Sequence, residues 1–253
     1  MNVDGLAAVI TGGGSGIGAE CARVLAKEGA KIAVLDLNLE GAKNVAAECG
    51  GVAVECDVTS SESAVRAVGK AKEANGIAQL LINCAGIATP GRIVNRNGPL
   101  PLEDYEAVIK VNLIGTFNMI RLIAADMQYA DPMEDNERGL IINTASVAAY
   151  EGQIGQAAYS SSKGGIVALN IVAARELARS GIRVNTISPG LIDTPMMAGL
   201  PPEAYESLSK QPEFPKRLGT PKDYAKLVLH LCENVLINGE VIRLDGALRM
   251  AAR

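Results

Sequence analysis

The sequence is poor in aromatic residues and in histidine. Among 253 residues there is no tryptophan, and there are two phenylalanines and one histidine. That single histidine, His230, lies in YAKLVLHLCEN (224–234), away from the motifs described below. We therefore expect His230 to be structural. Because neither an H-E-x-x-H motif nor a Cys/His cluster is present, the sequence predicts no catalytic metal.

Excess charge of one sign and paired cysteines are also missing. The net charge is -4, and charged residues make up 21% of the chain, which gives no broad attraction to nucleic acid or anionic membrane. The five cysteines show no CxxC spacing, and their odd number is typical of a reducing compartment. No uninterrupted apolar run approaches membrane-spanning length, and no basic leader precedes the first apolar run. We expect a cytoplasmic protein with neither nucleic acid nor membrane as a partner.

What the sequence does contain is a regular alternation of short apolar runs with amphipathic stretches. The apolar runs are 6–11, 31–37, 51–58, 79–86, 138–146, 182–190 and 240–246. They are almost continuous in apolar residues, as expected for parallel strands that are covered on both faces. The pattern predicts an α/β fold: a Rossmann-type, doubly wound sheet of seven parallel strands with helices on both faces. One domain would span 1–253.

Three segments interrupt the alternation. The segments 88–104 and 128–139 are rich in Gly, Pro, Asn and charged residues, so we expect surface loops there. A third segment, 193–219, is long and carries several prolines, and we expect it to be a lid over the substrate. Met196, Met197 and Leu200 in this segment would either cover the substrate or only pack within the lid.

A glycine-rich loop, TGGGSGIG (11–18), follows the first apolar run and opens a helical stretch. Glycines allow a tight turn there and let backbone N–H groups approach a pyrophosphate at the helix N-terminus. Two spacings fit: Gly14-x-Gly16-x-x-Ala19 and Gly12-x-x-x-Gly16-x-Gly18. The loop predicts a dinucleotide site, although a simple turn between strand and helix would look similar.

Acidic residues end the second and third runs. Asp36 lies about 20 residues beyond the glycine loop, where a carboxylate binds the ribose hydroxyls and repels a 2′-phosphate. This position favours NAD over NADP, unless Asp36 is only a solvated strand end. Asp57 would hydrogen-bond the adenine amino group or serve as a helix N-cap partner beside Thr59 and Ser60. The small residues of NCAG (83–86) would accommodate the ribose or form a simple turn.

Tyr159 and Lys163 lie in AAYSSSKGG (157–165), four residues apart in a predicted helix from about 156 to 180. Such a pair shares one helix face and could be a solvated edge pair. However, the helix follows the run that ends at Ser146, and ligands bind at the carboxyl ends of parallel strands. Beside an oxidised nicotinamide ring, the Lys163 ammonium would lower the phenol pKa, so that Tyr159 could act as general base. Ser146 would hold the substrate oxygen, and Lys163 would also bind the nicotinamide ribose.

In order and spacing, these motifs resemble the short-chain dehydrogenase/reductase family, together with Asn112 in KVNLIGT and with SPGLIDTPM (188–196). The resemblance implies that Asn112 holds a water molecule that connects Lys163 to solvent. It also implies that Pro189 and Gly190, with Ile192 and Thr194, hold the carboxamide. The implied NAD-binding residues are Gly12, Ser15, Gly16, Ile17, Gly18, Asp36, Asp57, Val58, Cys84, Tyr159, Lys163, Ile192 and Thr194. Many members have Asn where this chain has Cys84.

Three longer segments resemble family members that interconvert 3-hydroxyacyl-CoA and 3-oxoacyl-CoA with NAD, including 2-methyl-branched esters. These segments are 141–160, EFPKRLG (213–219) and NGEVIRLDGALRM (238–250). The resemblance also implies a homotetramer. Gln153 and Gln156 would contact the acyl carbonyl or only cap the helix. Steroid, sugar or other secondary alcohols, and carrier-protein esters, remain alternative substrates, although carrier-protein reductases usually prefer NADPH. A cofactor-binding protein without catalytic activity is a further alternative.

Overall fold

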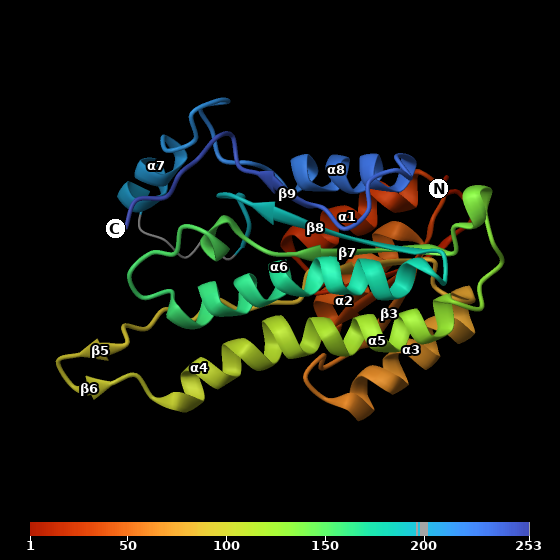
Figure 1. The fold of residues 1–253 in the computed structure, drawn as a ribbon, viewed down its shortest axis with the longest axis horizontal. Coiled ribbons are helices and arrows are strands. Elements are labelled where there is room, and N and C mark those ends of the chain that lie inside the picture. Colours follow the sequence, from red (N-terminus) through yellow and green to blue (C-terminus); the bar gives the residue numbers. More distant parts are fainter. Residues whose placement is uncertain (196, 198–201, 253) are drawn as a thin grey trace.

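In the computed structural model, the seven predicted strands form a single parallel sheet (Figure 1). The structure describes residues 1–195, 197 and 202–252. The strands are β1 (Ala7–Thr11), β2 (Lys31–Asp36), β3 (Val52–Glu55), β4 (Leu80–Asn83), β7 (Gly139–Thr144), β8 (Ile182–Pro189) and β9 (Val241–Leu244). Their order is β3-β2-β1-β4-β7-β8-β9, and every neighbouring pair is parallel. The predicted fold class is confirmed.

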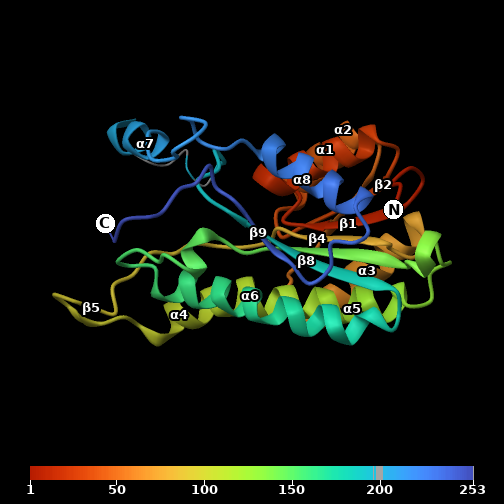
Figure 2. The ribbon, with the colours of Figure 1, turned by 45° about the horizontal axis from the view of Figure 1, so that its top comes forward.

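Helices cover both faces of this sheet (Figure 2). One face carries α1 (Gly16–Lys27), α2 (Leu39–Cys49) and α8 (Pro221–Glu233), and the other carries α3 (Ser61–Asn75), α4 (Leu102–Ile109), α5 (Thr116–Met127) and α6 (Ala157–Ala178). Successive strand residues point to opposite faces. Accordingly, Ile10 packs in the core under α1 and α8, whereas Val9 packs in the core under α3 and α5. Both positions must be apolar, which explains the unbroken apolar runs.

The helix from α4 to α5 is continuous through a π-helical segment, Lys110–Gly115. By length and composition, Leu102–Met127 could cross a membrane, and half of its most apolar window is buried within the protein. The sequence expectation considered only uninterrupted runs, and this helix is interrupted by the buried polar residues Asn112 and Asn118. The helix contacts α3, α6, β4 and β7. This packing accounts for its apolar character.

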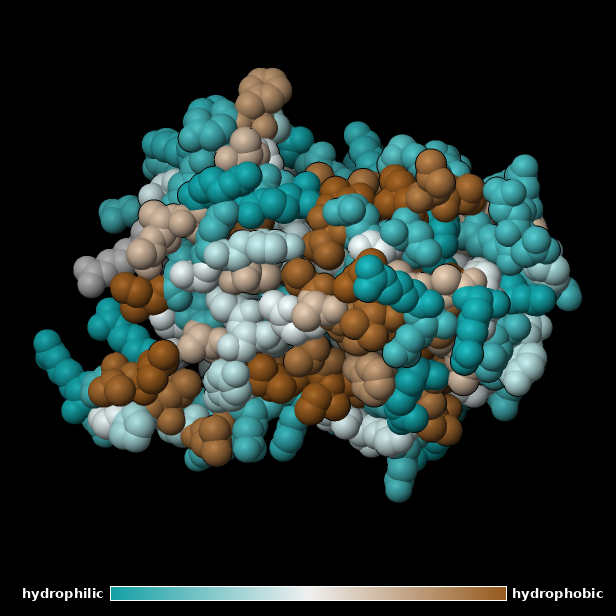
Figure 3. All heavy atoms as spheres, viewed as in Figure 1, coloured by the Kyte–Doolittle hydropathy of each residue, from teal (hydrophilic) through white to brown (hydrophobic). Residues whose placement is uncertain are grey.

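The predicted surface loops contain short regular elements. Within 88–104, β5 (Val94–Asn95) and β6 (Gly98–Pro99) form an antiparallel hairpin. The side chains of Ile93 and Val94 on this hairpin are 70% and 68% exposed, and apolar side chains gather at this corner in Figure 3. The loop 128–139 contains one 3-10 turn, Glu134–Asn136. The predicted lid, 193–219, contains α7 (Pro202–Ser209), while Met196 and Leu200 lie outside the described residues.

Candidate active site

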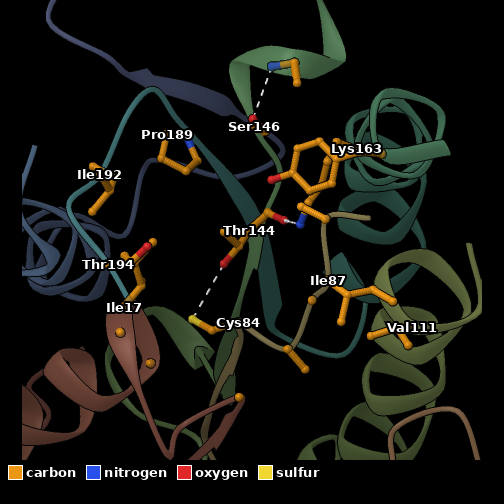
Figure 4. A pocket seen from close by; sticks show the side chains of 18 of the residues that line it. Ile17, Cys84, Ile87, Val111, Thr144, Ser146, Lys163, Pro189, Ile192 and Thr194 are labelled. Carbon is orange, nitrogen blue, oxygen red and sulfur yellow. Dashed lines mark hydrogen bonds between the residues drawn. The ribbon is translucent and has the colours of Figure 1, made fainter. Parts of the chain in front are cut away.

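A cavity of about 640 Å³ lies where the carboxyl ends of the strands meet (Figure 4). It is lined by all the residues predicted to bind the cofactor: Gly12, Ser15, Gly16, Ile17, Gly18, Asp36, Asp57, Val58, Cys84, Tyr159, Lys163, Ile192 and Thr194. Ser146 and Gln156 line the same cavity. The structure therefore brings residues from most of the chain length to one site. Open α/β sheets bind ligands at this edge.

The glycine loop is packed too closely for side chains. A Cβ atom at Gly12 would lie 2.7 Å from the backbone nitrogen of Ala85, and one at Gly18 would overlap the carbonyl of Gly12. Ser15 is the N-cap of α1, and its side chain makes no capping hydrogen bond. The first N–H groups of a helix carry partial positive charge and need acceptors. A pyrophosphate group fits this end of the cavity.

Asp36 is held in place at the end of β2. Its carboxylate accepts hydrogen bonds from the backbone N–H of Gly14 at 2.9 Å and of Asn38 at 2.9 Å. Among the described residues that line the cavity, the one cation is Lys163. Its Nζ donates to the Thr144 carbonyl and not to Asp36. No lining cation accompanies Asp36 to receive a 2′-phosphate. This arrangement fits a cofactor with a free ribose 2′-hydroxyl.

Asp57 stabilises the turn before α3, while its hydrogen bond to adenine stays a prediction. Its Oδ1 accepts from the backbone N–H of Thr59 at 2.9 Å and from the Thr59 hydroxyl at 2.7 Å, which fixes the turn before α3. Ser60, not Asp57, is the N-cap residue of α3. Asp57 nevertheless lines the cavity. It can therefore stabilise the turn and still face a bound ligand.

Cys84, which stands where many family members have Asn, is held by a neighbouring strand. The Thr144 hydroxyl donates to the Cys84 Sγ at 3.6 Å and pairs with the Tyr224 hydroxyl at 2.8 Å (Figure 4). The sequence did not single out Thr144. Its carbonyl also binds Lys163, so this one residue at the end of β7 organises two sides of the cavity.

Three predicted reacting residues converge at the end of β7. Ser146 lies two residues beyond the end of the strand, and its Oγ accepts from the Ala148 N–H at 3.1 Å. Lys163 is only 5% exposed, donates from Nζ to the Thr144 carbonyl at 2.7 Å, and lies 5.6 Å from the centre of the Tyr159 ring. Ser146 and Lys163 both line the cavity, and Figure 4 shows the Lys163 Nζ beside Thr144. The Tyr159–Lys163 pair is therefore not a solvated edge pair.

The protein alone raises the pKa of Tyr159 rather than lowering it. Burial is the main cause, and a hydrogen bond with Ser146 acts in the opposite direction. Burial also lowers the pKa of Lys163 to about 8. The expectation that Lys163 acidifies the phenol is thus not met by the chain alone, because removal from water opposes charge on both groups. The lowering of the Tyr159 pKa beside an oxidised nicotinamide ring stays a prediction.

Asn112 lies behind the cavity wall. It is completely buried; its Oδ1 accepts from the Ile87 N–H at 2.8 Å, while its Nδ2 donates to the Ile87 carbonyl at 2.9 Å and to the Ser162 Oγ at 3.0 Å. This side chain therefore ties the segment after β4 to α6. The water-holding role implied for Asn112 stays a prediction, and these contacts leave its side-chain amide engaged with protein.

The two glutamines before α6 differ in position. Gln156 lines the cavity, and its Oε1 accepts from the Gln153 N–H at 3.0 Å. Gln153 is not among the lining residues, and its Nε2 donates to the Ala251 carbonyl at 3.1 Å. The Gln153 side chain therefore neither lines the cavity nor caps α6, because it binds the C-terminal segment. The predicted contact of Gln156 with substrate stays open.

Met197, which the sequence expected either to cover the substrate or to pack within the lid, lines the cavity. Other lining residues had no motif to reveal them, namely the apolar residues Ile87, Val111, Val147 and Met250. Single apolar residues carry no signal of function in one sequence, because core positions look the same. Among the described residues, no group of three or more His, Cys, Asp or Glu side chains could hold a metal ion.

Comparison with known proteins agrees with the family resemblance of the sequence motifs. The family described as short chain dehydrogenase matches residues 6–204. The human protein named 3-hydroxyacyl-CoA dehydrogenase type-2 is 49% identical, over 98% of this chain and 97% of its own. A crystal structure of 3-hydroxyacyl-CoA dehydrogenase type-2 from Mycobacterium avium is 40% identical, with a TM-score of 0.92 over 98% of both chains.

A second solved structure is informative about the cofactor. A 3-ketoacyl-(acyl-carrier-protein) reductase from Brucella melitensis, complexed with NADH, is 29% identical, with a TM-score of 0.88 over 98% of this chain and all of that one. These matches, together with the glycine cradle and the Ser146, Tyr159 and Lys163 cluster, identify an oxidoreductase that uses a nicotinamide cofactor. The chain belongs to the short chain dehydrogenase family.

Proposed function

We propose that this protein is an NAD-dependent dehydrogenase that interconverts 3-hydroxyacyl-CoA and 3-oxoacyl-CoA esters. The observation that carries the proposal is the joining of two features in one cavity: Asp36 among the cofactor-binding residues, and Ser146, Tyr159 and Lys163 among the reacting ones. The names of the human and mycobacterial relatives support this substrate class. Short-chain and 2-methyl-branched esters are the substrates we propose.

Asp36 supports NAD over NADP. Its carboxylate is fixed by two backbone N–H groups, and a 2′-phosphate placed beside it would be repelled without a cation to compensate. The cofactor held here would supply hydride transfer to or from the carbon that bears the reacting oxygen. The α1 N-terminus and the glycine loop would hold the pyrophosphate.

The reacting residues divide the remaining work. Ser146 Oγ would donate a hydrogen bond to the substrate oxygen and hold it near Tyr159. The Tyr159 hydroxyl would take the proton from a substrate alcohol, or return it to a ketone oxygen, as general base or acid. Lys163 would bind the ribose and supply positive charge, a charge that its burial already makes costly. Because burial disfavours the charged forms of both Tyr159 and Lys163, a further charge in the cavity would shift the pKa of each.

A carrier-protein reductase is the second candidate function. The Brucella melitensis neighbour has that name and binds NADH, so NADH use alone does not separate the two activities. Steroid and other secondary alcohols would use the same reacting groups. These candidate substrates differ in the part of the molecule beyond the reacting carbon. Only rates measured with each substrate can therefore separate the candidate functions.

A substrate panel tests the proposal. Rates with acetoacetyl-CoA, 2-methylacetoacetyl-CoA, a steroid ketone and an acetoacetyl carrier-protein ester should be measured with NADH and with NADPH. We expect the CoA esters with NADH to give the highest kcat/KM. A clear preference for the carrier-protein ester, or for NADPH, would contradict the proposal.

Substitution of the general base tests the mechanism in the same assay. Tyr159→Phe removes the proton-transfer group, so we expect kcat to fall by about 10²–10⁴-fold. NADH affinity, measured by fluorescence titration, should remain within a few-fold. Tyr129→Phe is the matched control because the Tyr129 side chain is 75% exposed. A Tyr159→Phe variant with near-normal turnover would rule out this role.

The cellular compartment is also a proposal. Cys21, Cys49, Cys56, Cys84 and Cys232 are all free thiols. Free thiols are typical of reducing compartments, so we propose a cytoplasmic location.

A further inference from the structure

The chain beyond β9 folds back toward the cavity. Gly246 and Ala247 both have positive φ angles, 60° and 62°, and the Ala247 N–H donates to the Asp245 Oδ1 at 3.0 Å. Leu248 is 1% exposed and anchors the turn in the core. Figures 1 and 2 show the tail that follows running beside the loop that leads to α6.

Glu151, in that loop, binds β9 at one residue and the tail at two. Its carboxylate accepts from Arg243 Nη1 at 2.9 Å and from the backbone N–H of Met250 at 3.0 Å. The Nε of Arg249 lies 3.4 Å from the same carboxylate. We call Glu151, Arg243, Arg249 and the Met250 backbone the tail clasp. The Glu151 and Arg243 side chains are 21% and 24% exposed, so solvent screens this pair less than a surface pair.

Two further bonds continue along the tail. The Ile154 N–H donates to the Ala252 carbonyl at 3.1 Å, and Gln153 Nε2 donates to the Ala251 carbonyl. Terminal residues usually fray unless they are tied down. Here residues 250, 251 and 252 each bond to the loop 150–156, so the tail is fixed in register beside the start of α6.

The clasp places one apolar side chain in the active site. Met250 lines the same cavity as Val147, Gln156 and the reacting residue Tyr159. Methionine is flexible and fills irregular apolar space. A substrate chain that extends past Tyr159 would therefore meet Met250. The position of Met250 depends on the Glu151 carboxylate, which accepts from its backbone N–H.

We propose that Met250 is a specificity-determining residue for the acyl chain and that Glu151 is the positioning residue that holds it there. The acyl character of the ligand rests on the proposed function, whereas the positioning of Met250 by Glu151 does not. Without the clasp, the tail would lose its charged anchor, and the wall of the cavity beyond Tyr159 would open.

Chain-length profiles test the role of Met250. We would measure kcat/KM for 3-oxoacyl-CoA esters from four to ten carbons with NADH. We expect Met250→Ala to raise the ratio of long-chain to short-chain kcat/KM by about tenfold, through KM, with kcat within about threefold. We expect Glu151→Gln to shift the ratio in the same direction, Glu151→Asp to restore part of it, and the Glu151→Gln, Met250→Ala double variant to add little.

Glu62→Gln is the matched control, because Glu62 is 90% exposed on α3 and pairs only at 3.9 Å with Arg66. An unchanged profile in Met250→Ala would overturn the specificity role. Fully additive effects of Glu151→Gln and Met250→Ala would overturn the positioning role.

Hydrogen exchange tests the clasp without any substrate. In Glu151→Gln, we expect peptides that cover residues 246–252 to exchange at least tenfold faster than in the wild type, while NADH affinity stays unchanged. Arg249→Gln is a second, milder variant, since the Arg249 side chain is 63% exposed and its loss should not prevent folding. Unchanged exchange in both variants would overturn the clasp. If the wild type turned over no acyl-CoA, the proposed function would be wrong. Hydrogen exchange would still show whether Glu151 holds the tail in place.

Discussion

At the scale of single residues, Tyr159 shows how the site balances opposing effects. Burial favours the neutral phenol, and the hydrogen bond with Ser146 favours the phenolate. Because burial is the larger effect, the pKa of Tyr159 in the protein alone lies above its ordinary value of about 10. The general base would therefore be almost entirely protonated at neutral pH until the charge in the cavity changes.

This balance can be measured by titration. In the cofactor-free protein, we expect Tyr159 to remain protonated up to at least about pH 10, since a raised pKa moves ionisation to higher pH. The measurement is tyrosinate absorbance against pH, taken as the difference between the wild type and Tyr159→Phe so that the other five tyrosines cancel. With saturating NAD, the ionisation should move to lower pH.

The comparison with NADH is the control for this titration, because its nicotinamide ring is uncharged and should lower the pKa of Tyr159 less than NAD does. Ionisation of Tyr159 near pH 7 in the cofactor-free protein would show that Lys163 acidifies the phenol by itself. The burial argument would then be wrong.

The sequence could identify Tyr159 and Asp36 because each stands at a fixed spacing from another marked position. It could not identify Thr144 or Met250. Thr144 acts through its backbone carbonyl on Lys163, and any residue type supplies a carbonyl. Met250 reaches the cavity only because the tail turns back at Gly246 and Ala247. Long-range contacts of this kind leave no local pattern.

At the scale of elements, the strands were the easiest part to predict. The central strands are buried on both faces, so their apolar runs are continuous, as Val9 and Ile10 show. The edge strands β3 and β9 are mostly half-buried. The hairpin β5–β6 was harder, because each of its strands has only two residues and its apolar side chains are exposed. Helix α7 lies in a proline-rich segment that resembles a loop, and Pro202 occupies its first position, where proline is tolerated.

A buried ion pair joins β8 to α8 and to the segment before β7. Arg183 Nε donates to the Glu137 Oε1 at 2.7 Å, and these side chains are 8% and 6% exposed. Nη1 of Arg183 also donates to the carbonyls of Leu231 at 2.9 Å and Ile237 at 3.0 Å. The guanidinium thus satisfies backbone acceptors around the end of α8, and Glu137 balances its charge.

Removal of Glu137 should therefore destabilise the fold. We expect Glu137→Ala to lower the free energy of unfolding by about 3–5 kcal/mol, because Arg183 would remain buried with an uncompensated charge. Urea denaturation followed by circular dichroism measures this change. Arg66→Ala, which breaks an exposed pair, should cost less than about 1 kcal/mol. A loss for Glu137→Ala as small as for this control would contradict the argument.

At the scale of the whole molecule, the two faces of the sheet are covered differently. Figure 2 shows α6 beside the continuous α4–α5 helix on one face. Their outer surface carries large apolar side chains that are about half exposed: Ile114 49%, Phe117 50%, Ile171 41% and Val172 49%. Apolar surface that remains outside the core is typical of subunit contacts. This arrangement supports the homotetramer that the family resemblance implies.

Charge substitutions on this surface test the assembly. By sedimentation velocity, we expect the wild type to form a tetramer of the 26.3 kDa chain. Phe117→Glu combined with Val172→Glu should produce smaller species at micromolar concentration, because burial of two unpaired carboxylates in an interface is costly. Phe214→Glu is the control, since Phe214 is 83% exposed in the segment before α8, the helix that covers the opposite face of the sheet. A monomeric wild type, or a double variant that still forms the tetramer, would show that this face is not a subunit interface.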